Sequence, residues 1–295
     1  MTRLIYTSDL HGHLPLYEAA GEATVRFEAA ALIFGGDLCP GTPSASSVDL
    51  PSSQPEFILR ELGPILRAWK RARPALRIFA IPGNDDCQTI LPALEELERE
   101  SLIENLHQRS ARLRDYTFVG LAFVPPTPFA IKDFERRDHT GARTREARMG
   151  PCVLGTPRGF EVLRDFEAYL NSNPTIEEEL NRLPVSEPQR TIAVIHCPPY
   201  RTRCDVLSSG QHIGSEALRR WIERVQPLLT LHGHIHESPR VSGAFCDRIG
   251  ATVVINPGAD PAGRDPHLVF INLEDLSALK HSAYGQSQTK EKESS

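Results

Sequence analysis

Five short polar clusters, each placed just after an apolar run, constrain the fold of this chain more than any other feature. The runs are short and rich in aliphatic residues, which is typical of buried strands. The clusters are Asp9-Leu10-His11, Gly36-Asp37, Gly83-Asn84-Asp85-Asp86, His196 and Gly233-His234-Ile235-His236. Carboxylate, imidazole and amide groups bind borderline divalent cations, and a rigid sheet can present them from its strand ends. Together the clusters predict a site for two metal ions.

The order of the clusters bears on domain organisation. No single cluster is informative, because an Asp-x-His or His-x-His pair also occurs on exposed strands. Ligands drawn from Asp9 through His236 require the chain to return repeatedly to one place, which favours a single domain over residues 1–276. The polar stretch 277–295 is predicted to be a disordered tail.

Predicted strands and helices alternate along the chain. Strands are expected at residues 3–8, 31–34, 76–81, 118–124, 191–195, 228–231, 252–255 and 268–271. Helices are expected at residues 14–30, 57–69, 91–97, 160–180 and 215–225. This alternation predicts an α/β (α+β) protein with sheets covered by helices.

Two stretches lack this periodicity. Residues 38–54 are rich in Pro, Ser, Gly and Thr and are predicted to form a loop. Residues 125–150 begin Pro-Pro-Thr-Pro-Phe and interleave six basic residues with acids. We expect a solvated surface loop there, with a lid over the substrate as the alternative.

Composition excludes several classes of protein. The net charge of −5 leaves no excess of positive charge to attract polyanions, so we expect no dedicated nucleic-acid-binding surface. No apolar run approaches membrane length, and the N-terminus lacks the pattern of a signal peptide. The six cysteines have no CxxC spacing, which argues against a zinc ribbon or a disulfide framework. We therefore expect a reduced, cytoplasmic protein.

The ordered set Asp-x-His, Gly-Asp, Gly-Asn-x-Asp, His and Gly-His-x-His resembles the calcineurin-like metallophosphoesterase superfamily over positions 3 to 260. The resemblance implies a four-layer αββα sandwich, with two mixed β-sheets flanked by helices and a dimetal site on strand-end loops. Asp9, His11 and His236 would bind the first metal. Asn84, His196 and His234 would bind the second, and Asp37 would bridge both. The ions would be divalent Mn, Fe, Zn, Co or Ni, since these ligands suit all five.

The resemblance also implies hydrolysis of a phosphoester by a metal-bridging hydroxide. Relatives usually place a His after the Asn of Gly-Asn-x-Asp, where it contacts phosphate or protonates the leaving oxygen. This chain has Asp85 there. Its usual pKa, near 3.9, leaves it unable to donate a proton at neutral pH unless burial raises that pKa. Asp86 is expected to orient a ligand such as His11.

Candidate catalytic residues are therefore His196, Asn84, His13 and Asp85, and His212 and Arg201 are further candidate donors. His13 is a donor candidate because it stands two residues beyond His11. For His212 and Arg201 a solvated surface position is the alternative.

Within the superfamily, the chain resembles the compact bacterial and archaeal phosphodiesterases more than the Ser/Thr protein phosphatases, since Leu38-Cys39-Pro40-Gly41 follows Gly36-Asp37 where the latter carry Asp-Arg-Gly. We therefore expect a phosphodiesterase acting on a small phosphoester, with nucleotide-like diesters among the candidates. A phosphomonoesterase or a nucleotide pyrophosphohydrolase is the alternative within the superfamily. An inactive metal-binding interaction scaffold is the alternative from another class. Substrate, native metals and oligomeric state are not determined by the sequence.

Overall fold

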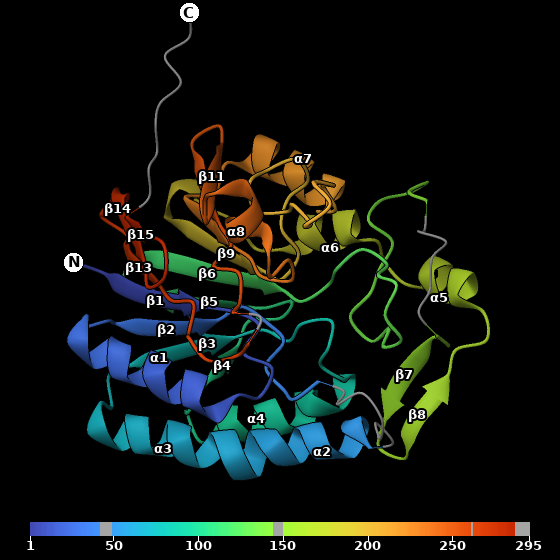
Figure 1. Ribbon diagram of the computed structural model, residues 1–295, viewed down its shortest axis with the longest axis horizontal. Helices are drawn as coiled ribbons and strands as arrows, with labels where there is room; N and C mark the ends of the chain where they lie inside the picture. Colours follow the sequence, from blue (N-terminus) through green and yellow to red (C-terminus); the bar gives the residue numbers. More distant parts are fainter. Residues whose placement is uncertain (42–48, 144–149, 261, 287–295) are drawn as a thin grey trace, which may run out of the picture.

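Two large β-sheets lie face to face, and helices cover their outer surfaces (Figure 1). The computed structural model describes residues 1–41, 49–143, 150–260 and 262–286. This layering confirms the predicted αββα sandwich.

The first sheet has the strand order β15-β14-β13-β1-β2-β3-β4. Its strands are β1 (Arg3–Thr7), β2 (Ala31–Phe34), β3 (Arg77–Ala80), β4 (Glu104–Asn105), β13 (Val269–Asn272), β14 (Asp275–His281) and β15 (Gly285–Gln286). The second sheet has the order β11-β12-β10-β9-β6-β5. Its strands are β5 (Ser110–Leu113), β6 (Tyr116–Leu121), β9 (Thr191–Ile195), β10 (Leu229–Leu231), β11 (Cys246–Ile249) and β12 (Thr252–Ile255).

The helices of the described residues flank both sheets. They are α1 (Leu14–Arg26), α2 (Leu50–Glu56), α3 (Gly63–Ala72), α4 (Leu91–Arg99), α5 (Phe166–Ser172), α6 (Ile176–Arg182), α7 (Glu216–Val225) and α8 (Ser238–Ser242). A π-helical segment (Phe57–Leu62) joins α2 to α3, and short 3₁₀ turns occupy Gln88–Ile90 and Pro188–Arg190. The antiparallel pair β7 (Val153–Thr156) and β8 (Gly159–Val162) lies near α5, at one end of the molecule (Figure 1).

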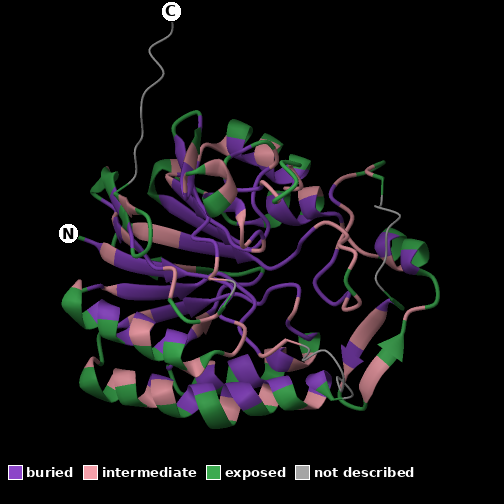
Figure 2. Ribbon diagram, viewed as in Figure 1, coloured by how far each residue is buried: buried purple, intermediate pink, exposed green. Residues whose placement is uncertain are grey.

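Alternating side chains of the strands build the layers. In β1, Leu4 and Tyr6 pack between the sheets, whereas Ile5 faces α1 and the helices beside it. Phe79 of the first sheet stacks on Phe118 of the second, with ring centroids 4.8 Å apart. Helices α6 and α7 pack on the outer face of the second sheet. The central strands of both sheets are therefore buried on both faces, and exposed residues lie mainly on the outer helix surfaces and on edge strands such as β14 (Figure 2).

Strand direction determines where the site forms. β1, β2, β3 and β4 run parallel, as do β6, β9, β10 and β12. The carboxyl ends of parallel strands meet at one edge of a sheet, which is where ligands bind in open α/β sheets.

Three expectations need correction. The predicted helix 160–180 is instead strand β8 followed by α5 and α6, because Pro174 separates the two helices and Thr175 caps the second. The tail predicted from Ser277 is wrong over residues 277–286, where β14 and β15 extend the first sheet. Residues 287–295 lie outside the described residues. The loop 38–54 ends earlier than predicted, since α2 begins at Leu50, and residues 42–48 are not described.

The stretch 125–150 is not simply a solvated loop. The side chains of Lys132 and Glu135 are fully buried, and the Lys132 Nζ lies 2.9 Å from both carboxylate oxygens of Glu135. Each buried charge therefore has its partner, which is what burial requires. Residues 144–149 lie outside the described residues, and a lid over the substrate stays a prediction.

Within the described ranges, no helix is long and apolar enough to cross a membrane.

Candidate metal centre

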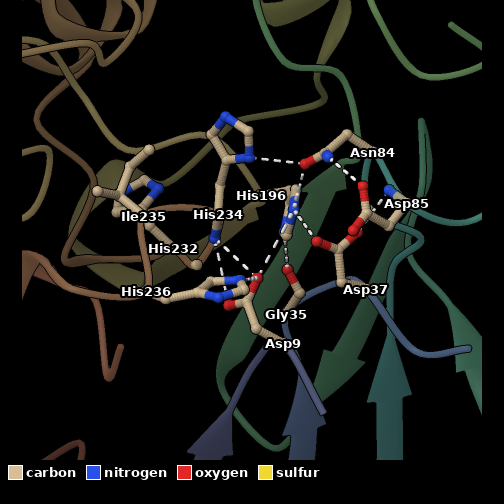
Figure 3. A network of polar contacts seen from close by, with 12 residues as sticks. Asp9, Gly35, Asp37, Asn84, Asp85, His196, His232, His234, Ile235 and His236 are labelled. Carbon is tan, nitrogen blue, oxygen red and sulfur yellow. Dashed lines mark hydrogen bonds and ion pairs between the residues drawn. The ribbon is translucent and has the colours of Figure 1, made fainter. Parts of the chain in front are cut away.

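The seven predicted ligands converge at the carboxyl ends of strands from both sheets (Figure 3). They follow β1, β2 and β3 in the first sheet and β9 and β10 in the second. These residues are Asp9, His11, Asp37, Asn84, His196, His234 and His236. The convergence follows from parallel strand direction, as the sequence pattern predicts.

One group of four residues presents ligand atoms within 4.8 Å of one another: Asp9, His11, Asp37 and His236. The Nε2 atoms of His11 and His236 lie 3.3 Å apart, and His236 Nε2 lies 3.2 Å from Asp9 Oδ1. Two imidazole nitrogens and carboxylate oxygens thus point at one small volume. This donor set suits a borderline divalent cation.

A second group gathers around Asn84. Its Oδ1 lies 3.1 Å from His196 Nε2 and 2.6 Å from His234 Nδ1. Asp37 Oδ2 lies 3.4 Å from His196 Nε2 and 3.9 Å from His11 Nε2, so this carboxylate stands between the two groups. A carboxylate with two oxygens can contact two cations at once.

The electrostatics of the centre attract positive charge. Burial by itself would lower the pKa of His196 and His236, but Asp37 and Asp9 raise these values to about 10 and about 9. Burial likewise opposes ionisation of Asp9, yet His236, His196 and His11 hold the pKa of its carboxyl far below the usual range. Divalent cations would supply that positive charge when bound, so the residues present fit a metal centre.

Four of the seven ligands have left-handed backbone conformations. The φ angles are 59° at Asp9, 44° at His11, 50° at Asp37 and 66° at His234. Non-glycine residues rarely adopt positive φ, and such strain concentrates at functional sites. Hydrogen bonds between the loop after β1 and the loop after β2 stabilise these backbone conformations. Asp9 N–H donates to the Gly36 carbonyl at 3.0 Å, and His11 N–H donates to the Asp37 carbonyl at 2.9 Å.

The glycines of two clusters allow close approach to ligand side chains. A Cβ on Gly36 would lie 2.3 Å from Nδ1 of His196, and a Cβ on Gly83 would lie 2.2 Å from Oδ1 of Asp37. Gly36 also has a φ of 117°. Any larger residue at either position would displace a ligand.

Comparison with known proteins identifies the family of this chain. The sequence model of the calcineurin-like phosphoesterases matches residues 2–238. The chain belongs to this family. Two solved structures, the second being TT1561 of Thermus thermophilus, align with TM-scores of 0.60 and 0.57. Each is 16% identical and covers 95% of this chain and 98% of its own.

A novel archaeal phosphodiesterase aligns at 14% identity with a TM-score of 0.40, over 95% of this chain and 98% of its own. No curated protein sequence matches the chain. At these identities the structural likeness concerns the fold alone, so the site must be argued from its own residues.

Asp85, where this calcineurin-like chain departs from the usual histidine, orients Asn84. The Asn84 side-chain amide donates to Asp85 Oδ1 at 2.8 Å, which turns Asn84 Oδ1 toward His196 and His234 (Figure 3). Asp85 Oδ2 also lies 3.8 Å from His11 Nδ1. Burial, with repulsion from Asp37 and Asp86, raises the pKa of the Asp85 carboxyl to about 7.

Asp86 does not orient His11, contrary to the expectation from sequence. Its buried carboxylate accepts hydrogen bonds from the backbone N–H groups of Leu38, Cys39 and Gly83, at 3.0, 2.9 and 2.8 Å. Asp86 therefore ties the loop after β2 to the loop after β3. Asp86 thus holds the loop that directly follows Asp37, and it contacts backbone N–H groups instead of the predicted His11 side chain.

The other predicted donors lie in different places. The His13 ring lies close to Gly263, in a cavity that Asp9 and His11 also line. His212 Nδ1 lies 2.7 Å from Oδ1 of Asp205. Among the described residues, neither His212 nor Arg201 bonds to a predicted ligand; the Arg201 guanidinium lies over the Tyr200 ring.

Two supporting residues escape sequence reasoning. Asn256 donates from its side-chain amide to the carbonyls of Gly233 and Ile235, both at 3.1 Å, and so shapes the loop that carries His234 and His236. His232 donates its Nδ1 proton toward the Ile195 carbonyl at 2.8 Å, beside the strand that carries His196. The Asn256-Pro257-Gly258 sequence indicates a turn at Asn256, whereas no sequence pattern marks His232 as a supporting residue.

Proposed function

We propose that this chain is a dinuclear metal-dependent phosphodiesterase. Asp9, His11 and His236 hold one ion, and a second set holds the other: Asn84, His196 and His234. Asp37 bridges them. The observation that carries the proposal is the position of Asp37, whose Oδ2 lies 3.9 Å from a histidine of the first set and 3.4 Å from a histidine of the second.

Bound divalent cations would polarise a phosphoryl oxygen and lower the pKa of a coordinated water. The protein's own side chains hold the geometry. His196 Nδ1 donates to the Gly35 carbonyl at 2.8 Å, which fixes its tautomer and directs Nε2 at the site. Asp85 fixes the orientation of the Asn84 amide in the same way. Both ligands are thus oriented before any ion binds.

Asp85 also favours a diester over a monoester. Its side chain is 37% exposed at the edge of the centre, where relatives offer a histidine. Above about pH 7 its carboxyl is mostly ionised. A phosphomonoester or pyrophosphate then brings at least two negative charges near this carboxylate, whereas a diester brings one. Coulomb repulsion grows with the product of the charges, so the diester meets less of it.

A metal-reconstituted activity screen tests the proposal. The full chain is loaded in turn with Mn, Fe, Zn, Co and Ni and assayed on aryl phosphodiesters, cyclic nucleotides, monoesters and pyrophosphates. We expect the highest kcat/KM on diesters. Asp37→Ala should abolish turnover, and retained activity in that variant would refute the bridging role. A protein that binds two metals and turns over no ester would instead be a scaffold.

A further inference from the structure

A cavity of 280 Å³ opens beside the first ligand group. One wall contains three ligands of that group, Asp9, His11 and His236. The opposite wall is the loop after β12, which contributes Ala259, Asp260, Ala262, Gly263, Asp265 and His267. Leu10 and Leu16 add apolar surface. A phosphoryl group bound at the metals would therefore have this cavity as its neighbour.

Hydrogen bonds fix the loop that forms the far wall to the loop that carries His236. The Ala259 N–H donates to the His236 carbonyl at 3.1 Å. His267 Nδ1 donates to the Pro257 carbonyl at 3.0 Å, and His281 Nε2 donates to the same oxygen at 3.0 Å. His281 has its proton on Nε2 because Nδ1 accepts two backbone N–H groups, the nearer that of Ala283 at 2.9 Å. The loop is thus fixed to both β14 and a ligand.

The absence of a side chain at Gly263 keeps the cavity open beside His13. Its φ is 60°, and a Cβ there would lie 3.0 Å from Cε1 of His13. A larger residue at this position would press on the His13 ring. The volume suits one small group, since drug-sized ligands occupy cavities of roughly 300–1,000 Å³.

The charge of the far wall restricts what can bind. Asp260 is turned into its own loop, where it accepts the N–H groups of Ala262, Arg264 and Asp265. Asp265 adds a second carboxylate. His267 donates through Nδ1, so its neutral ring offers Nε2 as an acceptor. Neither Lys nor Arg lines the cavity within the described residues. The wall accepts hydrogen bonds and repels anions.

We propose that this cavity binds the alcohol portion of a phosphodiester, and that it selects a small, uncharged, hydroxyl-bearing alcohol over an anionic one. Hydroxyl groups donate to the Asp265 carboxylate and to Nε2 of His267, while C–H groups contact the leucine and alanine side chains. The inference rests on the proposed function, because the phosphoryl group must lie at the metals for the alcohol to reach the cavity.

Equilibrium binding of phosphinates, which carry one negative charge as a diester does, tests the proposal without turnover. Four ligands that resist hydrolysis are titrated into the Mn²⁺-loaded full chain by calorimetry: dimethylphosphinate, butyl(methyl)phosphinate, 3,4-dihydroxybutyl(methyl)phosphinate and 4-carboxybutyl(methyl)phosphinate. We expect the dihydroxy ligand to bind best, ahead of the carboxylate ligand by about two- to fivefold, within the range for exposed charge interactions. Asp265→Asn should reduce this discrimination. Asp115→Asn, in the turn at the far end of β6, should not.

A second variant tests the location. Ala262→Trp places a large ring at an exposed position of the cavity wall and should weaken the dihydroxy ligand to the level of dimethylphosphinate, whose own affinity stays unchanged. Ala251→Trp, exposed in the turn before β12, is the matched control. Equal binding of the dihydroxy and carboxylate ligands, or an Ala262→Trp variant that binds like wild type, refutes the subsite alone. If dimethylphosphinate itself fails to bind, the proposed phosphoryl site is wrong and the subsite is refuted with it.

Discussion

Removing the Asp85 side chain should selectively weaken the second metal. The Asn84 amide donates to Asp85 Oδ1 at 2.8 Å, and this bond helps to orient Asn84 Oδ1 toward the two histidines of its group. A hydrogen bond to a charged acceptor contributes about 1.5–3 kcal/mol. Losing a partner that orients a metal ligand costs about 10–100-fold in metal affinity. The two estimates agree, since 1.4 kcal/mol is about tenfold.

The assay is calorimetric titration of the metal-free protein with Mn²⁺ at neutral pH. Asp85→Ala is compared with Asp85→Asn rather than with wild type, because both variants lose the negative charge and only the alanine loses the acceptor. We expect two Mn²⁺-binding events in each variant. The affinity of the weaker event should be at least about tenfold lower in Asp85→Ala than in Asp85→Asn. The stronger event should be the same in both variants. Equal affinities for the weaker event would refute the orienting role of Asp85.

Three further predictions concern the site and its support. Gly36→Ala should destabilise the protein by at least about 2 kcal/mol in urea unfolding, because its Cβ meets His196 at 2.3 Å; Gly141→Ala, with open space around it, should cost only about 1 kcal/mol. An equal loss in both would argue against that contact. Burial, with Arg136 and Arg109, lowers the pKa of His107 to about 3. The unfolded chain therefore binds a proton at His107 near pH 6.5, whereas the folded chain does so only near pH 3. The free energy of unfolding should fall by up to about 1.4 kcal/mol per pH unit as pH drops from 6.5 toward 3. His107→Gln should remove that component, and an unchanged slope would contradict it. Finally, above about pH 7, where Asp85 is mostly ionised and cannot protonate the leaving oxygen, rates of diester hydrolysis should depend more steeply on leaving-group pKa in wild type than in Asp85→His. Equal slopes would contradict this.

The convergence of the candidate ligands could be predicted from sequence because they lie where strand direction dictates. Asp9, Asp37 and His196 each follow a buried strand, and parallel strands bring such residues to one edge of their sheets. The layered fold follows from the same strands. Asp86 could not be placed in this way, because two of its three partners are backbone N–H groups in a loop 47 or 48 residues away. Sequence patterns describe side chains and carry little information about which backbone donors a fold leaves unpaired.

Other errors have similar physical causes. The buried Lys132–Glu135 pair looked like solvated charge, since only the fold shows that each residue finds its counterion. β14 reads as a polar tail because it lies near the edge of the first sheet, where alternate side chains face water. The cavity wall at Gly263 and His267 lies after the last cluster, in a loop whose sequence carries no metal-ligand signal.

Each ligand group draws on both sheets, and this links metal binding to folding. Asp9 and His11 come from the first sheet and His236 from the second; Asn84 and His196 divide in the same way. An ion held by such a group cannot remain fully ligated if the two layers separate. By mass action, metal at 100 times its dissociation constant should add about 2.7 kcal/mol per site to the free energy of unfolding. Removal of the metals by a chelator should therefore lower the melting temperature as well as the activity. The size of this thermal shift would measure how much metal binding stabilises the packing of the two sheets.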